Sequence, residues 1–196
     1  RPSTNNKITS ATLLEKLQAI KNEIKLKNHG LFISTIESLI NKVKLFGTHF
    51  ASLDIRQDSR IHTVTLIAIN QSLIDAGLDP IFPENYAALS ENEKIAALEN
   101  INRAVDPEIL ADPVAKDTLK SMQAVKTIQT ENGVLGCHRY VISNCQSALH
   151  MAEVYALFTL SGWQGEKTFD IVPLFETIDD LAEAASIMDK VYTLSM

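Results

Sequence analysis

The segment Phe50-Ala51-Ser52-Leu53-Asp54-Ile55-Arg56 decides the fold class, because it is a short alternating stretch that a helical pattern follows directly. The same order recurs twice. A strand-like segment at 139–143 precedes a helical pattern at 148–160, and another at 168–175 precedes one at 178–194. Strands that alternate with helices pair in parallel through crossover connections. We therefore predict a helix-rich α/β fold with about three parallel strands, as either a segment of a (β/α) barrel or a small open sheet.

Two helical patterns precede the first strand. Thr12 and Glu15 have the spacing of a capping box at the start of the first pattern, and Gly30 can end it before the second begins. We expect these two patterns to form an antiparallel helical hairpin over residues 1–48. The partial β/α barrel then occupies residues 49–196.

Further helices are expected between and after the strands. Each begins at a residue whose side chain can accept a hydrogen bond from the first helical turn. The expected starts are Asp58 or Ser59, Ser90 with Glu93, and Thr177 with Asp180, and a longer helix over 114–130 ends near Gly133.

Composition limits the class of protein. The 196 residues are 45% hydrophobic and 21% charged, which predicts a globular chain, and the net charge of −6 argues against nucleic acid or an acidic membrane as partner. Cys137 and Cys145 lack metal-site spacing, so we expect two reduced thiols of a cytoplasmic protein, with a disulfide as the alternative. There is no transmembrane or signal-peptide pattern. A start at Arg1 and a stop at Met196 suggest an excised piece.

The first strand carries a candidate anion-binding residue. Alternation puts Ser52, Asp54 and Arg56 on one face, and reactive groups in α/β folds lie at the carboxyl ends of strands. A guanidinium there can present a planar fork to a phosphate or a carboxylate. The alternative is an arginine that pairs with Asp54 or a neighbouring acid for structural reasons.

The third strand leads to a candidate metal ligand. Glu176 shares a face with Val172 and is the last residue before the final capping position, where a carboxylate can bind Mg²⁺ or Mn²⁺. The alternative is a glutamate that interacts with the helix dipole. Helix capping explains Asp179 and Asp180 better than catalysis does. Pro173 removes one ladder donor, so this strand is expected to be irregular or at an edge.

The histidines are weaker candidates. His62 follows Asp58 by four residues and could approach the strand ends, but a structural role is the simpler interpretation. The same holds for the others, which lie near element ends: His29, His49, His138 and His150.

Two stretches are more specific than these patterns. Phe46-Gly47, Leu53-Asp54-Ile55-Arg56-Gln57-Asp58-Ser59 and His62-Thr63 together resemble a segment of phosphoenolpyruvate carboxylases. Val172-Pro173-Leu174-Phe175-Glu176-Thr177-Ile178-Asp179-Asp180-Leu181 is similar to the PLFET-x-DDL signature of the same family, in the same order and at a similar separation. Tyr140-Val141-Ile142-Ser143 falls where the family has a YxIS strand.

The resemblance implies an internal piece of that enzyme, with part of its catalytic barrel. Family members convert phosphoenolpyruvate and bicarbonate to oxaloacetate and phosphate with Mg²⁺ or Mn²⁺, and are usually homotetramers built around an eight-stranded barrel. The resemblance further implies that Arg56 contacts the phosphate of phosphoenolpyruvate and that Glu176 is one of two acidic metal ligands.

The sequence also departs from the family. Ser59-Arg60-Ile61-His62-Thr63 places its arginine one position earlier than the usual pattern, and Asn144 to His150 replaces the usual residues after the second strand. The catalytic-histidine motif, the second metal aspartate and the glycine-rich loop of the family are missing from this sequence. We therefore expect no complete catalytic set, no tight metal binding by the chain alone, and no activity without the rest of the polypeptide.

Two other functions stay open at this point. One is a non-catalytic helical interaction module in which Arg56 and Glu176 form an ion pair. The other is a different barrel enzyme that acts on phosphoenolpyruvate or pyruvate, although no metal and lysine motif of such an enzyme is recognisable.

Overall fold

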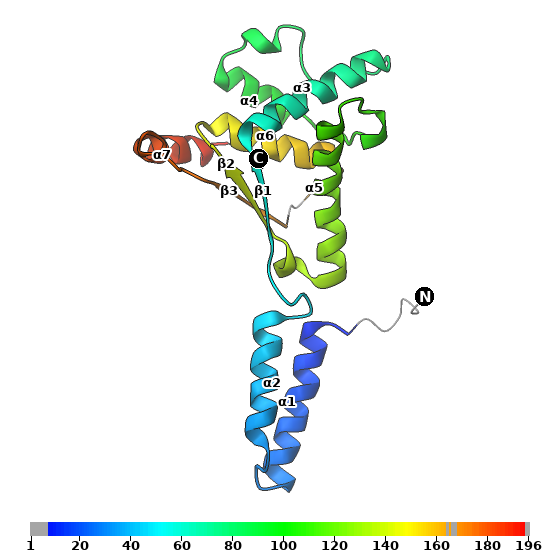
Figure 1. Ribbon diagram of the computed structural model, residues 1–196, viewed down its shortest axis with the longest axis vertical. Coiled ribbons are helices and arrows are strands. Elements are labelled where there is room, and N and C mark those ends of the chain that lie inside the picture. Colours follow the sequence, from blue (N-terminus) through cyan, green and yellow to red (C-terminus); the bar gives the residue numbers. More distant parts are fainter. Residues whose placement is uncertain (1–7, 164, 166–167, 195–196) are drawn as a thin grey trace. The chain divides into compact units, whose positions relative to one another are not determined.

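The computed structural model describes residues 8–163, 165 and 168–194 (Figure 1). Residue contacts divide the chain into two compact units, residues 1–52 and 53–196. Within the described residues no helix is long and apolar enough to cross a membrane. The elements in chain order are α1 Ser10–Lys27, α2 Ile33–Phe46, β1 Asp54–Asp58, α3 Ser59–Asp75, η1 Tyr86–Ala88, α4 Glu91–Glu99, η2 Pro107–Ile109, α5 Pro113–Asn132, η3 Val134–Gly136, β2 Arg139–Ser143, α6 Ala148–Leu160, β3 Asp170–Pro173 and α7 Ile178–Val191.

The first unit consists of α1 and α2, which pack against each other. Their contact buries Leu17, Ile40 and Val43, and Lys21 pairs with Glu37 at 2.8 Å. This small apolar seam is separate from the main hydrophobic core.

The first helix begins earlier than its capping-box spacing predicted. Thr9 is the N-cap, and its hydroxyl accepts a hydrogen bond from the backbone N–H of Thr12 at 3.1 Å. Thr12 is therefore inside the first turn, so the prediction that it starts the helix was wrong. Thr9 and Thr12 can both cap a helix with a side-chain hydroxyl. Capping at Thr9 lengthens the helix by almost one turn and so adds backbone hydrogen bonds.

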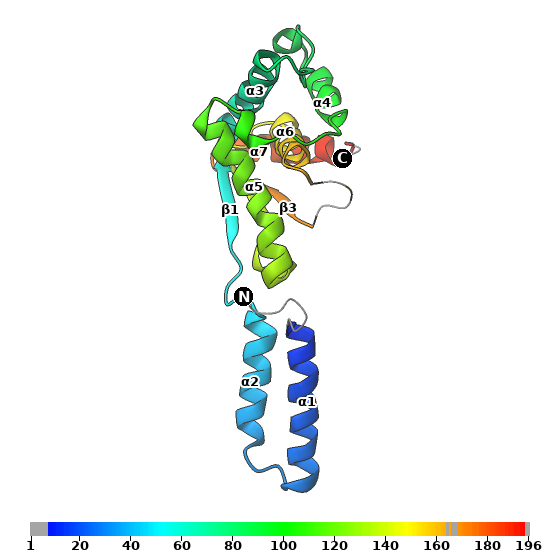
Figure 2. The same cartoon turned by 90° about the vertical axis from the view of Figure 1, so that its right-hand side faces the viewer.

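The second unit is built on a three-stranded parallel sheet in the order β1-β2-β3. Ile55, Tyr140, Ile142 and Ile171 point to the face that packs against the helices. Figure 2 shows α5 and α6 beside this sheet. Since successive side chains alternate, residues such as Arg56 lie on the opposite face. The helix-rich α/β class with three parallel strands is confirmed.

The bounds of β1 differ from the prediction. Pairing runs from Asp54–Arg139 to Asp58–Ser143, so the strand is 54–58 instead of starting at Phe50. Phe50 has a φ of +62°, which is outside the extended region and ends the alternation. The third strand is likewise shorter than predicted, although the Leu174 N–H still donates to the Ile142 carbonyl at 2.9 Å.

Aromatic packing fills the core between the sheet and α6. The Phe158 ring meets Tyr140 edge-on, with ring centroids 5.3 Å apart, and stacks on Phe169 at 3.6 Å. Trp163 meets both Phe158 and Phe169 edge-on and donates its indole N–H to the Met122 carbonyl at 3.1 Å. These contacts hold α5, α6 and the start of β3 together.

Both cysteines are buried and free. Cys137 precedes β2 and Cys145 follows it, and burial raises the pKa of the Cys145 thiol to about 11. In the structure the two cysteines are not joined in a disulfide, and their reduced state stays a prediction.

A matched pair of leucines tests this core. Leu157 in α6 is fully buried, whereas Leu181 in α7 is 61% exposed. Leu157→Ala should lower the free energy of unfolding of the 196-residue chain by about 2–5 kcal/mol, because it leaves a cavity. Leu181→Ala should change it by less than about 0.5 kcal/mol. Urea denaturation followed by circular dichroism measures both, and equal losses would contradict the assigned core.

Candidate functional site

The loops that follow the three strands are tied together at one edge of the sheet. The Ser59 hydroxyl donates to the backbone carbonyl of Asn144 at 2.7 Å, which links the end of β1 to the end of β2. The side-chain amide of Gln146 donates to the Asp180 carboxylate at 3.4 Å, which links the end of β2 to the start of α7. The carboxyl-end edge is therefore a continuous surface contributed by three separate segments.

Arg56 lies on the face of the sheet away from the helices. It pairs in register with Val141, which pairs with Val172 on the third strand. The Arg56 side chain is 66% exposed, and among the described residues it forms a long ion pair of 3.4 Å with Asp54. An exposed pair of this kind contributes little to stability, about 0–1 kcal/mol. A guanidinium held this loosely is available to bind an anion from solvent.

Glu176 is exposed and follows β3 by three residues. Because the strand ends at Pro173, its alternation does not extend to Glu176, and the prediction that Glu176 shares the face of Val172 through a continuing strand was wrong. The Glu176 backbone N–H donates to the Asp180 carboxylate at 3.3 Å, so the backbone here is anchored while the side chain faces solvent.

Arg56 and Glu176 do not contact each other. In the described chain no ion pair joins them, and β2 lies between their strands. Neighbouring strands are spaced about 4.8 Å apart, so β1 and β3 are roughly 10 Å apart at this level.

Asp180 and Asp58 act as helix caps. Asp180 accepts the Thr177 N–H at 3.0 Å, while the Thr177 hydroxyl accepts the Asp180 N–H at 3.0 Å, so the predicted capping box of α7 is confirmed. Asp58 caps α3 and forms a two-point pair with Arg60 at 2.7 and 2.9 Å. Arg60 lowers the pKa of Asp58 to about 2, and this pairing occupies the displaced arginine.

A metal site is incomplete within the described residues. No group of three or more His, Cys, Asp or Glu side chains there is close enough to hold an ion. The exposed carboxylate of Glu176 has the oxygen donors that Mg²⁺ and Mn²⁺ prefer. One carboxylate supplies at most a few of the ligands that such an ion needs.

His62 is a core residue and does not reach the strand-end edge. It is fully buried, and its Nε2 lies 2.9 Å from the Tyr140 hydroxyl. Burial lowers the pKa of His62 to about 4, so the ring is neutral at pH 7. The structural interpretation therefore holds for this histidine.

Glu153 is a chemically unusual residue that the sequence patterns did not single out. Its side chain is 2% exposed on α6, and both carboxylate oxygens accept from the Thr63 hydroxyl, at 2.9 and 3.0 Å. Burial raises the pKa of Glu153 to about 7. The available signal was a single acid inside the otherwise apolar segment Ala148–Leu160.

The raised pKa of Glu153 predicts a pH-dependent stability. The pKa of Glu153 is higher in the folded chain than in the unfolded chain, so protonation of this acid favours the folded state. Its contribution to the free energy of unfolding is fully present at a pH below the pKa of the unfolded chain, and it is lost as the pH rises through about 7. The unmodified chain should therefore lose roughly 3 kcal/mol of its free energy of unfolding between pH 5 and pH 8, and Glu153→Gln should not show this loss. Glu183→Gln, on the exposed face of α7, is the control. The same difference in free energy of unfolding between Glu153→Gln and the unmodified chain at pH 5 and at pH 8 would contradict the burial of a titrating acid.

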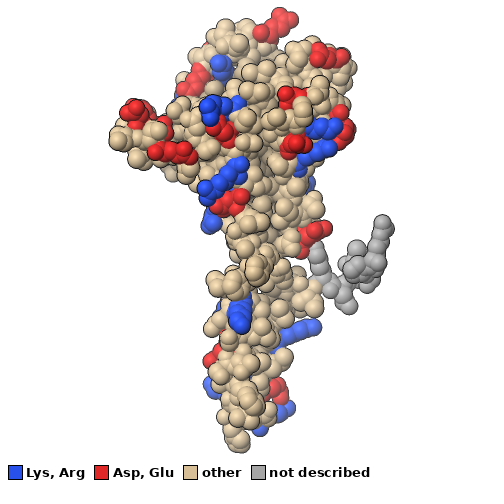
Figure 3. All heavy atoms as spheres, in the orientation of Figure 1, with Lys and Arg blue, Asp and Glu red and all other residues tan. Residues whose placement is uncertain are grey.

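The charged surface outside this edge is mixed in sign. On the face shown in Figure 3, basic side chains lie next to acidic ones. Ion pairs of this type join Lys116 and Lys120 to Glu108 at 2.6 and 2.7 Å.

Comparison with known proteins connects this edge to a family. The family model described as phosphoenolpyruvate carboxylase matches residues 2–196. Among curated proteins, the chain is 34% identical over 186 residues to phosphoenolpyruvate carboxylase of Prochlorococcus marinus (strain MIT 9312), covering 91% of this chain and 18% of that protein. It is 29% identical over 201 residues to the Synechocystis protein of the same name, covering 98% and 19%. The protein of that name from Gloeobacter violaceus is 29% identical over 179 residues, covering 87% and 18%.

These matches span nearly the whole chain but less than a fifth of each relative. They include the three strands and the edge that carries Arg56 and Glu176. The chain therefore belongs to the phosphoenolpyruvate carboxylase family.

Proposed function

We propose that the complete polypeptide that carries this chain converts phosphoenolpyruvate and bicarbonate to oxaloacetate and phosphate. The family match over residues 2–196 is the observation that carries this proposal. The exposed guanidinium and carboxylate near one edge of the sheet give it a chemical basis, because the reaction transfers a phosphoryl group and passes through an enolate.

Arg56 is proposed to bind the phosphate of phosphoenolpyruvate. Its side chain is largely exposed, and its ion pair with Asp54 among the described residues is long, so binding a phosphate does not require breaking a strong pair. A guanidinium can donate two parallel hydrogen bonds to phosphate oxygens. The same contact stabilises the charge that develops on the phosphoryl group when a bicarbonate oxygen attacks phosphorus and the bond to the enol oxygen breaks.

Glu176 is proposed to be one ligand of the metal ion. Together with acidic ligands from the rest of the polypeptide it would hold Mg²⁺ or Mn²⁺, which supplies positive charge next to the transferred phosphoryl group and the enolate oxygen. The hydrogen bond from the Glu176 backbone to Asp180 and the capping box at Thr177 hold the backbone that carries this carboxylate at the sheet edge. Preorganisation of this kind favours a fixed ligand geometry.

We also propose that the sheet is part of a (β/α) barrel. Its helix-covered face is apolar, whereas the other face carries Asp54, Arg56, Arg139 and Asp170, as expected of strands that face a barrel interior with a polar site. We propose that residues 1–48 form a helical hairpin segment and residues 49–196 the barrel segment. A homotetramer in the cytoplasm stays our prediction for the complete protein.

The interaction-module alternative has less support. It requires an ion pair between Arg56 and Glu176, but in the described chain Arg56 pairs with Asp54 instead. The family match also favours the carboxylase over a different barrel enzyme.

Substitution of the two proposed residues tests their roles. In the complete polypeptide, Arg56→Gln should lower kcat/KM for phosphoenolpyruvate by at least about 100-fold, because a phosphate contact that strengthens in the transition state is lost. Glu176→Gln should raise the Mn²⁺ concentration for half-maximal activity by about tenfold or more. Arg139→Gln is a matched control, since Arg139 is exposed at the amino end of β2. If Arg56→Gln has the same kcat/KM as the unmodified polypeptide, the proposal that Arg56 binds the phosphate is wrong.

The 196-residue chain on its own should not form oxaloacetate. Mg²⁺ needs near-octahedral coordination, and one carboxylate cannot supply it. A coupled assay with malate dehydrogenase and NADH measures this at high protein concentration. Turnover above that of a heat-denatured sample would show that the chain holds a complete site.

A further inference from the structure

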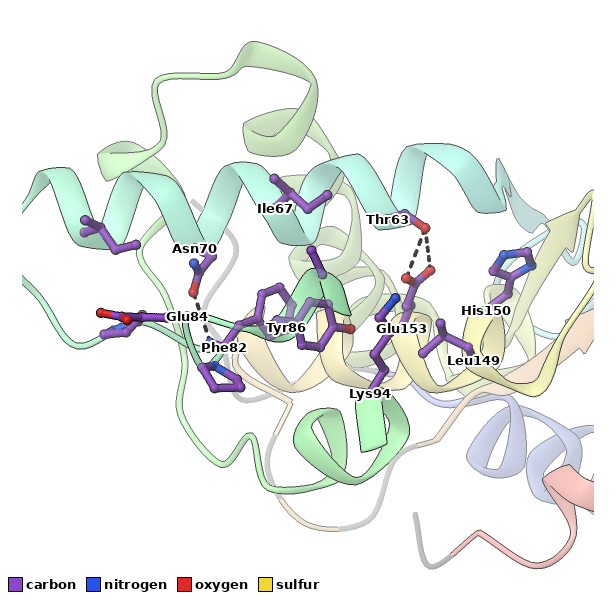
Figure 4. Close-up of a pocket in the computed structure, with 14 residues that line it drawn as sticks. Thr63, Ile67, Asn70, Phe82, Glu84, Tyr86, Lys94, Leu149, His150 and Glu153 are labelled. Carbon is purple, nitrogen blue, oxygen red and sulfur yellow. Dashed lines mark hydrogen bonds between the residues drawn. The ribbon is translucent and has the colours of Figure 1, made fainter. Parts of the chain in front are cut away.

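A cavity of about 720 Å³ lies between α3, the segment 80–87, α4 and α6 (Figure 4). Its volume is within the range of roughly 300–1,000 Å³ that is typical of small-molecule sites. Ile67, Ile74, Phe82 and Leu149 give it apolar walls. Phe82 stacks on Tyr86 with ring centroids 3.8 Å apart, so one wall is a rigid aromatic surface.

Two hydrogen-bond donors at one end of this cavity lack an acceptor. The hydroxyl of Tyr86 is buried without a hydrogen-bond partner among the described residues. The ammonium group of Lys94 lies 5.8 Å from the centre of the Tyr86 ring, and the ion pairs among the described residues do not include it. A buried hydroxyl without a partner costs about 1–3 kcal/mol, which a suitable ligand would recover.

Two further side chains at this end can also donate. Glu153 already accepts from Thr63, and burial raises its pKa to about 7, so a large share of it carries a proton at neutral pH. The His150 Nδ1 accepts the backbone N–H of Gln146 at 3.2 Å. Since burial lowers the pKa of His150, the ring is neutral and carries its proton on Nε2.

The Lys94 ammonium and the Tyr86 hydroxyl favour a ligand with a negatively charged group. A cationic ligand would be repelled by Lys94, and a purely apolar one would leave the Tyr86 hydroxyl unpaired. A carboxylate accepts from both donors and pairs with the ammonium charge. Glu84, the other acid in the lining, is exposed and lies beside Phe82, away from Glu153, in Figure 4.

We propose that this cavity binds a small monocarboxylate with a compact apolar body, whose carboxylate is held by Lys94 and Tyr86 and whose body packs against Ile67, Phe82 and Leu149. The proposal does not depend on the carboxylase reaction. It assigns a ligand site to the helices that pack on the sheet.

The proposed site predicts how its affinity for a carboxylate changes with pH. A bound carboxylate next to an ionised Glu153 is repelled, whereas a protonated Glu153 can donate to it. The groups that face Glu153 are Thr63 from α3, Lys94 from α4, Tyr86 from η1 and His150 on its own helix. Protonation of Glu153 removes this repulsion, so affinity should rise as the pH falls from about 8.5 to about 6.5.

Calorimetric titration of the complete polypeptide with 3-phenylpropanoate tests the proposal. Saturable binding with one molecule per chain is expected, and the matched neutral amide, 3-phenylpropanamide, should bind at least about tenfold more weakly. Lys94→Met and Tyr86→Phe should each weaken the carboxylate by about tenfold. The controls are Lys126→Met and Tyr192→Phe, which change the same residue types at exposed positions.

Three results would overturn the assignment: no saturable heat with a folded polypeptide, equal affinities for the acid and the amide, or equal losses in Lys94→Met and Lys126→Met. The comparison of acid with amide uses the unmodified polypeptide, so it decides the question even if a variant fails to fold. Because binding is read from heat, loss of carboxylase activity does not affect the outcome.

Discussion

Backbone hydrogen bonds from β2 to both of its neighbours set the register on which the second unit depends. Val141 pairs with Arg56 on one side and with Val172 on the other, so the three strands run level and finish at one edge. The same register directs Tyr140 and Ile142 to the opposite face, where the helices bury them. Shifting one strand by a single residue would exchange its two faces and expose its apolar side chains.

That register explains why a charged edge can exist beside an apolar core. The helix-covered face of the sheet buries the apolar side chains that a small sheet needs for stability. The other face can therefore carry charged residues. Hydrogen bonds from Ser59 to Asn144 and from Gln146 to Asp180 connect the loops that follow the strands. Arg56 and Glu176 therefore have fixed backbones but exposed side chains, as expected of groups that bind a ligand. In this account the chain supplies two binding groups, and the rest of the polypeptide completes the site.

Local patterns predicted much of this fold. The bounds of β2 and α6 agree with the prediction, because an apolar run is followed by a helical pattern that Gly162 can end. The start of β1 was misplaced because residues 50–53 alternate as well as residues 54–58 do, and only pairing with β2 distinguishes them. Glu153 and the helical cavity were missed since burial of an acid results from packing between segments distant in sequence. Strand alternation offered Arg56 and Glu176 as candidates beside structural alternatives, and the family resemblance then favoured the functional interpretation.

The central claim is that Arg56, on β1, and Glu176, in the loop after β3, face one ligand. A crystal structure of the complete polypeptide with Mn²⁺ and an unreactive analogue of phosphoenolpyruvate, with the ion located by its anomalous signal, tests it directly. The account predicts Mn²⁺ within about 2.0–2.2 Å of a Glu176 oxygen and the Arg56 guanidinium within hydrogen-bond distance of the analogue's phosphate group. An ion and a phosphate group bound away from either residue would contradict it.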